Sequence, residues 1–288
     1  MYLIAKYSWE DRIERARRLA SELAHAKEIL RFYGEILEWQ QGVFNSLADR
    51  SQQRPFSGVF ESDHPILLER FGSLLYLVGA RGSEALSEQA GEIASGPESW
   101  RETLTAYWNG ASNPEENFFA RACLQPYLEL LARERTPPLD SQINADAARR
   151  RATLDGAHAD SLCPFCGRDP QLAFLSTDVS APGPVEGGVE GGRRFLMCGE
   201  CFTAWPFQRI SCPSCLEVDP HKLPYYSAQE APGVRVECCD TCRRYLKSID
   251  LTKDARLVPP VDELAAIPLD LWAREHGYRK IQPNLAGM

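Results

Sequence analysis

The chain has 288 residues, of which 44% are hydrophobic and 25% are charged, and its formal net charge is −8 at pH 7. This length suggests two domains, and this composition is typical of a globular protein rather than a disordered one. The negative charge argues against a broad surface for nucleic acid or anionic lipid. The sequence contains no run of eighteen apolar residues and no signal-peptide core, so we expect a cytoplasmic protein with no membrane partner.

The first part of the chain has the apolar spacing of helices, with hydrophobic residues recurring every three or four positions. The segments that we expect to be helical are residues 13–37, 65–79, 100–108 and 113–130. Pro65 suits the start of a helix, residues 113–116 resemble a helix cap, and Pro126 would bend the helix that follows. Residues 1–136 are therefore predicted to form an all-α domain.

The pattern changes after Pro137-Pro138, where residues 137–161 form a polar connector. Short β-prone runs follow at residues 171–179, 194–197, 205–210, 234–237 and 245–249. Residues 181–192 are rich in glycine and proline, as in a hairpin tip or loop. Residues 259–288 contain a helix-like stretch at 261–276 and a tail. The predicted fold class is α+β: a helical domain, small β modules and a short C-terminal helical segment.

Eight of the ten cysteines occur in four Cys-x-x-Cys pairs within eighty residues, far above chance. The pairs are Cys163/Cys166, Cys198/Cys201, Cys212/Cys215 and Cys239/Cys242. Disulfide frameworks of this density belong to small secreted chains, so in this chain we interpret the pairs as metal ligands. Two such pairs complete a tetrahedral Cys₄ shell, which suits Zn²⁺ or a single iron ion.

Consecutive pairing predicts two modules in tandem, at residues 162–210 and 211–258, with one metal ion each. An interleaved pairing remains the alternative. Pro164 and Pro213 fix backbone angles within two of the pairs, and Gly167 supplies the permissive backbone geometry often needed directly after one. All-cysteine shells leave no open coordination position, so the expected role of both metals is structural.

The remaining candidates are weaker. Cys238 is a spare thiol, because taking it as a ligand in place of Cys239 would break the Cys-x-x-Cys spacing. Cys123 lies in an apolar helical pattern that is typical of a core. Arg243, Arg244 and Lys247 are explained by a solvated strand face. The five histidines are dispersed and show no zinc-ligand spacing: His25, His64, His158, His221 and His276.

Catalysis is not predicted. The sequence contains no nucleophile motif, P-loop or dinucleotide fingerprint, so no small-molecule substrate is expected. Thiol–disulfide exchange would require one metal-free pair, and nothing distinguishes one pair from the others. Nucleic acid is disfavoured as a partner, because residues 163–250 contain nine Lys/Arg against eleven Asp/Glu, and two filled Cys₄ sites would add negative charge.

The cysteine motifs, read with their flanks, resemble the formate dehydrogenase accessory proteins of the FdhE family. The similarity runs through Cys163-Pro-Phe-Cys166-Gly, Cys198-Gly-Glu-Cys201, Arg209-Ile-Ser-Cys212-Pro-Ser-Cys215 and Cys239-Asp-Thr-Cys242-Arg-Arg-Tyr. It continues in the tail through Gly277-Tyr278. The chain departs from the family pattern at Thr203-Ala-Trp-Pro206, where Thr-Glu-Trp-His is expected.

The resemblance implies a helical N-terminal domain and tandem rubredoxin-like modules whose eight paired cysteines hold two metal ions. It implies iron, whereas zinc fits the residues equally well. It also implies a cytoplasmic maturation factor that binds the immature catalytic subunit of formate dehydrogenase. The alternative prediction is a zinc-ribbon protein associated with nucleic acid or transcription.

Overall fold

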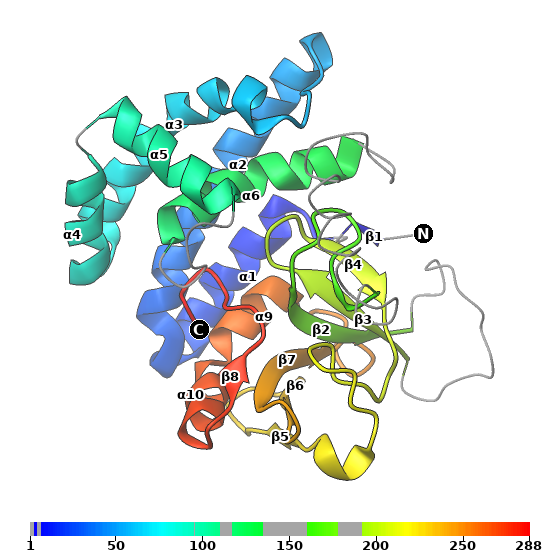
Figure 1. The fold of residues 1–288 in the computed structure, drawn as a ribbon. Coiled ribbons are helices and arrows are strands. Elements are labelled where there is room, and N and C mark those ends of the chain that lie inside the picture. The colour runs from blue at the N-terminus through cyan, green and yellow to red at the C-terminus, as the bar shows by residue number, and fades with distance from the viewer. Residues whose placement is uncertain (1–2, 5–6, 95, 110–116, 135–159, 178–191) are drawn as a thin grey trace.

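The computed structural model describes residues 3–4, 7–94, 96–109, 117–134, 160–177 and 192–288 (Figure 1). The predicted cap at residues 113–116, His158, nearly all of the connector at 137–161 and nearly all of the Gly/Pro-rich segment at 181–192 lie outside these residues. Among the described helices, none is both long and apolar enough to span a membrane.

The described residues of the N-terminal half form six α-helices. They are α1 Trp9–Glu22, α2 Lys27–Gln53, α3 Phe60–Arg81, α4 Glu84–Ile93, α5 Pro97–Trp108 and α6 Phe118–Glu134. The first predicted helix is in fact two helices, α1 and α2, separated by the 3₁₀ turn Ala24–Ala26. Helix α1 begins with a capping box, in which the Ser8 hydroxyl accepts from the Asp11 N–H and the Asp11 carboxylate accepts from the Ser8 N–H.

The expectation that Pro65 begins a helix is wrong, because α3 starts five residues earlier at Phe60. A proline inside a helix leaves one carbonyl without its backbone donor, here the carbonyl of Glu61. The ring Nδ1 of His64 lies 3.2 Å from that carbonyl oxygen. The neighbouring imidazole therefore provides a substitute partner, which explains how the helix tolerates Pro65.

Helix α6 lies at the centre of the helical region, and almost all of its residues are buried. Pro126 lies within it, as expected. Three buried polar residues, Arg121, Gln125 and Glu129, recur every four positions and so share one face of the helix. The Glu129 carboxylate accepts two hydrogen bonds of 2.8 Å from the guanidinium of Arg12 on α1. This polar face holds neighbouring elements against α6.

The C-terminal half is organised around one eight-stranded sheet. Its strands are β1 Leu3–Ile4, β2 Pro170–Ser176, β3 Arg193–Cys198, β4 Thr203–Pro206, β5 Tyr225–Ser227, β6 Val234–Cys239, β7 Arg244–Asp250 and β8 Arg279–Lys280. Their order is β1-β4-β3-β2-β7-β6-β5, with β8 paired to β7. The two expected β modules are therefore halves of a single sheet, joined where β2 and β7 pair in parallel with Leu172 opposite Lys247.

Strand β4 was expected at residues 205–210 but spans Thr203–Pro206. The reason is a long-range contact. The buried guanidinium of Arg194 on β3 donates to the carbonyl oxygens of Gln208 and Ser211 at 3.0 and 2.9 Å. The Phe207 N–H still donates to the Arg194 carbonyl of β3 at 3.1 Å, and the two side-chain bonds then hold residues 208–211 outside the sheet.

The C-terminal segment folds into two short helices, α9 Pro259–Ala265 and α10 Ile267–Glu275, where one was expected over 261–276. Helix α9 lies between α1 and the sheet (Figure 1). One hydrophobic core contains residues of the helices and of the sheet, such as Tyr127 and Leu196. A second core packs the sheet against α10. The fold class is as predicted, whereas the domain boundaries remain a prediction.

Lys247, expected on a solvated face, is fully buried, so that expectation is wrong. Its ammonium contacts the carboxylates of Glu263 on α9 and Asp270 on α10. Lys280 on β8 contacts the same two carboxylates. Burial alone would raise the pKa of Asp270, but the two ammonium groups hold it below its ordinary value. This network of two cations and two anions fixes the C-terminal helices to the sheet.

Candidate metal centres

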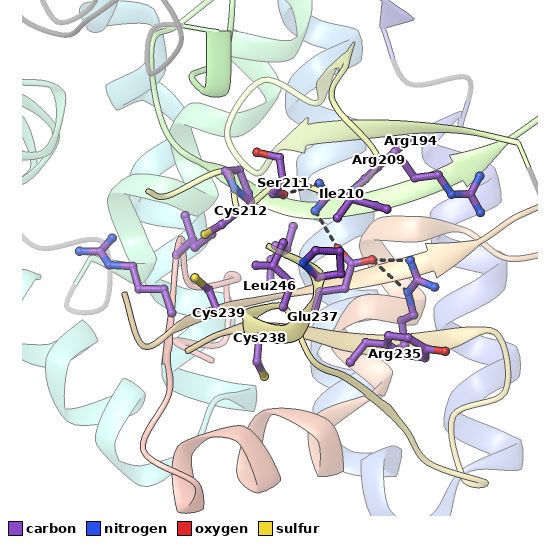
Figure 2. Close-up of a pocket in the computed structure, with 16 residues that line it drawn as sticks. Arg194, Arg209, Ile210, Ser211, Cys212, Arg235, Glu237, Cys238, Cys239 and Leu246 are labelled. Atoms are coloured by element: carbon purple, nitrogen blue, oxygen red, sulfur yellow. Dashed lines mark hydrogen bonds and ion pairs between the residues drawn. The ribbon is translucent and has the colours of Figure 1, made fainter. Parts of the chain in front are cut away.

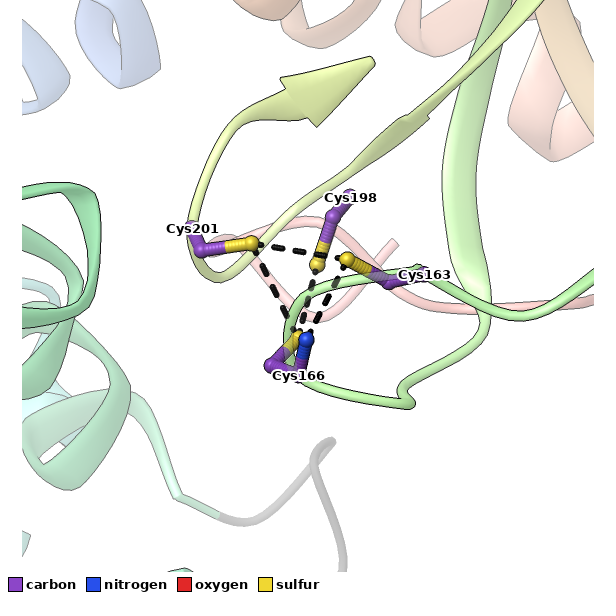
Figure 3. A group of neighbouring side chains, drawn as sticks. All are labelled: Cys163, Cys166, Cys198 and Cys201. Carbon is purple, nitrogen blue, oxygen red and sulfur yellow. Dashed lines mark hydrogen bonds between the residues drawn. The ribbon is translucent and has the colours of Figure 1, made fainter. Parts of the chain in front are cut away.

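The first cluster consists of Cys163, Cys166, Cys198 and Cys201, whose sulfurs point toward one another (Figure 3). Cys163 and Cys166 lie in the loop before β2, Cys198 ends β3, and Cys201 lies in the turn before β4. The sulfur of Cys166 is 3.4 Å from that of Cys198 and 3.8 Å from that of Cys201. Cys163 and Cys201 are 3.5 Å apart, sulfur to sulfur.

The second cluster consists of Cys212, Cys215, Cys239 and Cys242. Cys212 and Cys215 lie in the loop after β4, Cys239 ends β6, and Cys242 lies in the turn before β7. Sulfur–sulfur distances are 3.7 Å between Cys212 and Cys242 and 3.6 Å between Cys215 and Cys239. Both clusters thus bring together consecutive pairs, not interleaved ones.

The spacing of the sulfurs fits a tetrahedral metal ion. Within each cluster the four sulfurs lie within 4.8 Å of one another. Metal–sulfur bonds of about 2.3 Å in a tetrahedron place the sulfurs about 3.8 Å apart. The observed distances of 3.4 to 3.8 Å are close to that value and far above the length of a disulfide, about 2.05 Å. Each cluster could therefore hold one ion.

All four Cys-x-x-Cys turns share one backbone feature, a left-handed residue directly after the second cysteine. These residues are Gly167, Phe202, Leu216 and Arg243, with φ of 70°, 55°, 61° and 56°. Only glycine adopts this conformation without strain, and for other residues it costs about 1–2 kcal/mol. At Gly167, Leu216 and Arg243, the N–H of this residue donates to the carbonyl of the first cysteine, and this hydrogen bond stabilises the turn. We call each such turn a knuckle.

The knuckles also direct backbone N–H groups at sulfur. The N–H groups of Cys166 and Glu200 donate to the sulfurs of Cys163 and Cys198 at 3.5 and 3.4 Å. In the second cluster, the Ser214 N–H donates to the Cys212 sulfur at 3.4 Å. Donors placed in this way favour the thiolate over the thiol, which is the form that binds a metal.

Burial acts against that preference in the absence of metal. It raises the pKa of the Cys201 and Cys212 thiols well above the ordinary range, and it raises that of Cys215 to about 11. The thiols of Cys201, Cys212 and Cys215 would thus be protonated at neutral pH without metal. Burial alone would also raise the pKa of Cys242, but hydrogen bonds from the Arg244 N–H and from neighbouring cysteines hold it below its ordinary value. An incoming metal ion has to displace these protons, so metal affinity is coupled to pH.

A carboxylate inside the first cluster connects it to the helices. Glu200, between Cys198 and Cys201, is fully buried. Its Oε1 accepts from Arg121 Nε on α6 at 2.9 Å and from the Tyr107 hydroxyl on α5 at 2.8 Å. Gln125, also on α6, donates to the Gly199 carbonyl at 2.7 Å. The first cluster is therefore clamped against α5 and α6.

The second cluster lies nearer to solvent. Cys163, Cys198 and Cys201 of the first cluster are buried, whereas Cys215 and Cys242 of the second are half-buried. We infer that the first cluster stabilises the junction between the sheet and the helices, and that the second stabilises an exposed end of the sheet.

The other candidate residues lie apart from both clusters. Cys238 is buried in the second core on the face of β6 opposite to Cys239, and burial raises the pKa of its thiol to about 12. Cys123 is buried within α6, as expected. In the described part of the chain, His25, His64, His221 and His276 belong to no group of metal-type ligands.

Sequence reasoning missed Glu200 and its partners, because a single acidic residue between two cysteines does not indicate a buried ion pair. It also missed the arginines that surround the second cluster. A local signal existed only for Arg244, within a basic triplet that we interpreted as solvated.

Comparison with known proteins agrees with this architecture. The model of the FdhE C-terminal domain matches residues 210–286. An FdhE homolog of Aquifex aeolicus is 26% identical to this chain, and the alignment covers 93% of this chain and 92% of that protein. An FdhE homolog of Pectobacterium carotovorum is 27% identical, and the alignment covers 97% of this chain and 87% of that protein. The crystal structure of the FdhE protein from Pseudomonas aeruginosa has the same fold, with a TM-score of 0.66 and 20% identity over 99% of this chain and 98% of that one. Residues 210–286 thus match the FdhE C-terminal domain, and the chain is similar to FdhE proteins along nearly its whole length.

Proposed function

We propose that this protein is an accessory factor of formate dehydrogenase that binds the immature catalytic subunit in the cytoplasm. The observation that carries the proposal is the pair of complete Cys₄ clusters, set in a fold shared with FdhE along nearly the whole chain. The role would be to hold a protein surface and not to turn over a substrate.

The chemistry of the clusters supports a scaffold role. A Cys₄ shell occupies all four positions of a tetrahedral ion, so no position remains open for a substrate. The metals would instead fix the four knuckles, and with them the ends of β3 and β6. We propose two ions per chain, held by the eight paired cysteines. Iron is implied by the family, and zinc satisfies the same geometry.

The test is association with the catalytic subunit of formate dehydrogenase. The tagged chain is purified anaerobically, reduced or mildly oxidised, and mixed with subunit produced without its redox cofactors. The proposal expects a complex with the immature subunit and a weaker one with the mature enzyme. A strain that lacks the gene should lose formate dehydrogenase activity and recover it on complementation.

A matched pair of variants separates the scaffold from the surface. Cys212→Ser with Cys215→Ser removes half of the second cluster, whereas Cys123→Ser changes a buried cysteine of α6 that belongs to neither cluster. The first variant should lose association and the second should retain it. If the wild-type chain fails to associate in either redox state, and deletion leaves formate dehydrogenase activity intact, the proposal is wrong.

A further inference from the structure

A pocket of about 280 Å³ lies beside the second cluster, at the point where the chain passes from β4 into the Cys212 knuckle (Figure 2). Its lining includes the second-cluster ligands Cys212 and Cys239. The charged residues of the lining are Arg194, Arg209, Arg235, Arg244 and Glu237. We call this site the arginine pocket.

The alternation of side chains along β6 places these residues on one face of the sheet. Val234, Val236 and Cys238 point into the second hydrophobic core. The intervening Arg235 and Glu237 therefore point to the opposite face and line the pocket. In the register of the sheet, Glu237 lies opposite Leu246 on β7 and Tyr225 on β5. Three neighbouring strands thus form the floor.

The carboxylate of Glu237 accepts hydrogen bonds from two of the arginines. Arg194 Nη2 donates to Glu237 Oε2 at 2.7 Å, and Arg235 Nη2 donates to Glu237 Oε1 at 2.6 Å. Burial alone would raise the pKa of Glu237, but the two guanidinium groups hold it below its ordinary value. Both carboxylate oxygens are occupied, and the three side chains together carry one positive charge.

Two arginines of the pocket are exposed, Arg209 and Arg244. The side chain of Arg244 makes no hydrogen bond or ion pair with any residue that the structure describes. Arg209 donates to the Gly192 carbonyl at 2.6 Å. By formal charge, four arginines and one glutamate give the lining +3, in a chain whose net charge is −8. A divalent ion in the second cluster would leave two negative charges on its thiolates, and the lining would remain positive.

The rim of the pocket suits a protein segment. Ile210 and Tyr225 both line it and are 56% and 64% exposed. Tyr225 belongs to β5, the last strand in the order of the sheet, which pairs on one side with β6 and on the other with no described strand. A free strand edge can add an extended peptide through main-chain hydrogen bonds, while its side chains enter adjacent pockets.

We propose that an extended, acidic segment of the client subunit binds along β5 and places a carboxylate in the arginine pocket. This inference rests on the proposed function and specifies its docking surface. The planar guanidinium of Arg244 would bind the carboxylate in a bidentate manner. Arg194 would act as a positioning residue, because it holds Glu237 and the loop that leads to Cys212. Binding should then also depend on an intact second cluster.

A polyphosphate chain fits less well than a peptide. Nucleic acid gains its affinity from many phosphate contacts along a continuous basic surface. Here the cations converge on one small pocket with an apolar rim, and the chain as a whole is acidic.

The decisive variant is Arg244→Glu, which reverses an exposed cation and breaks no side-chain hydrogen bond or ion pair among the residues that the structure describes. Its matched control is Arg101→Glu on α5, another exposed arginine, whose partner Glu98 lies 3.5 Å away. Metal content and circular dichroism establish that both variants fold like the wild type. The affinity of each is measured for the immature catalytic subunit and for overlapping 15-residue peptides of that subunit.

We expect Arg244→Glu to weaken binding of the subunit at least tenfold and Arg101→Glu to change it less than twofold. The peptides that bind should contain aspartate or glutamate, and reversing that residue to lysine should restore binding to Arg244→Glu. Wild-type binding that persists unchanged in Arg244→Glu would overturn this inference and leave the proposed function intact. Absence of wild-type binding would overturn both.

Two further outcomes would identify another occupant. Displacement of the subunit by millimolar inorganic phosphate, without rescue by the charge-reversed peptide, would show that the pocket takes a phosphate group and would overturn the carboxylate assignment. Salt-dependent binding of DNA or RNA that disappears in Arg244→Glu would do the same in favour of nucleic acid.

Discussion

Replacing Arg121 by methionine and Glu200 by leucine, singly and together, isolates the buried ion pair that joins helix α6 to the first cluster. The two side chains are 1% and 0% exposed, and their Nε–Oε1 distance is 2.9 Å. Breaking such a pair from one side leaves an uncompensated buried charge, which costs about 3–5 kcal/mol. Removing both charges avoids that penalty, so the double variant should be about as stable as the better single variant, or more so.

The double-mutant cycle should therefore give a coupling free energy of at least about 2 kcal/mol. Glu200→Leu also removes the acceptor of the Tyr107 hydroxyl, whereas Arg121→Met also removes a donor to the Asn284 carbonyl. These extra contacts make each single variant less stable without changing the sign of the coupling. The result would show that the first cluster and the helical region unfold as one unit.

The assay is urea unfolding of the metal-loaded protein, followed both by tryptophan fluorescence and by far-ultraviolet circular dichroism. Coincident transitions justify a two-state treatment. The control is the same cycle at Arg17 and Glu38, a pair at 2.8 Å that is 67% and 47% exposed. That exposed pair should give less than about 1 kcal/mol. A buried coupling no larger than the exposed one would refute the proposed clamp.

Three further predictions concern the cysteines and the knuckles that hold them. Cys238 is buried in the second core with its pKa raised to about 12, whereas Cys242 is half-buried with a lowered pKa, so iodoacetamide at pH 8 should label Cys242 after chelation well before Cys238, as peptide mass mapping can check; earlier labelling of Cys238 would contradict its assigned place in the core. Since burial keeps the thiols of Cys201, Cys212 and Cys215 protonated without metal, zinc titration near pH 7 should release at least three protons for two ions. Acidification should release the metal, so the stability that the metal contributes is present at neutral pH and lost as pH falls; release of fewer protons would mean that these thiols are already ionised. Gly167→Val should destabilise the first knuckle by about 1–2 kcal/mol, because φ at this position is 70°. Leu216→Gly should instead stabilise its knuckle by relieving the strain at φ 61°. Competition with a chromophoric chelator measures the metal affinity of both variants, and equal changes in affinity would argue against backbone strain.

The parts of the fold that depend on local pattern could be predicted from the sequence. The spacing of Cys163, Cys166 and their counterparts follows from the chemistry of one ion, and the left-handed residue at position 167 follows from the turn. The amphipathic helices were recognised by their period, because that period reports burial directly. Helix breaks were missed where the break depends on a turn with no strong signal, as at Ala24–Ala26.

The missed features all depend on contacts between distant residues. Lys247 is buried only because Glu263 and Asp270 arrive from later helices to neutralise it. Strand β4 ends early because the guanidinium of Arg194, on the preceding strand, donates to the carbonyls of Gln208 and Ser211. The joining of two modules into one sheet depends on parallel pairing of β2 with β7, which leaves no mark in either segment alone.

The most direct test of the central claim, that two metal ions order this scaffold, is the metal content per folded chain of three anaerobically purified proteins. They are the wild type, a Cys163→Ser/Cys166→Ser variant and a Cys212→Ser/Cys215→Ser variant. We predict two ions in the wild type and one in the second variant. The first variant should keep at most one ion and lose the most stability, because its cluster is clamped to the helices. A wild-type protein without stoichiometric metal, whose cysteines are free or joined in disulfides, would contradict the account.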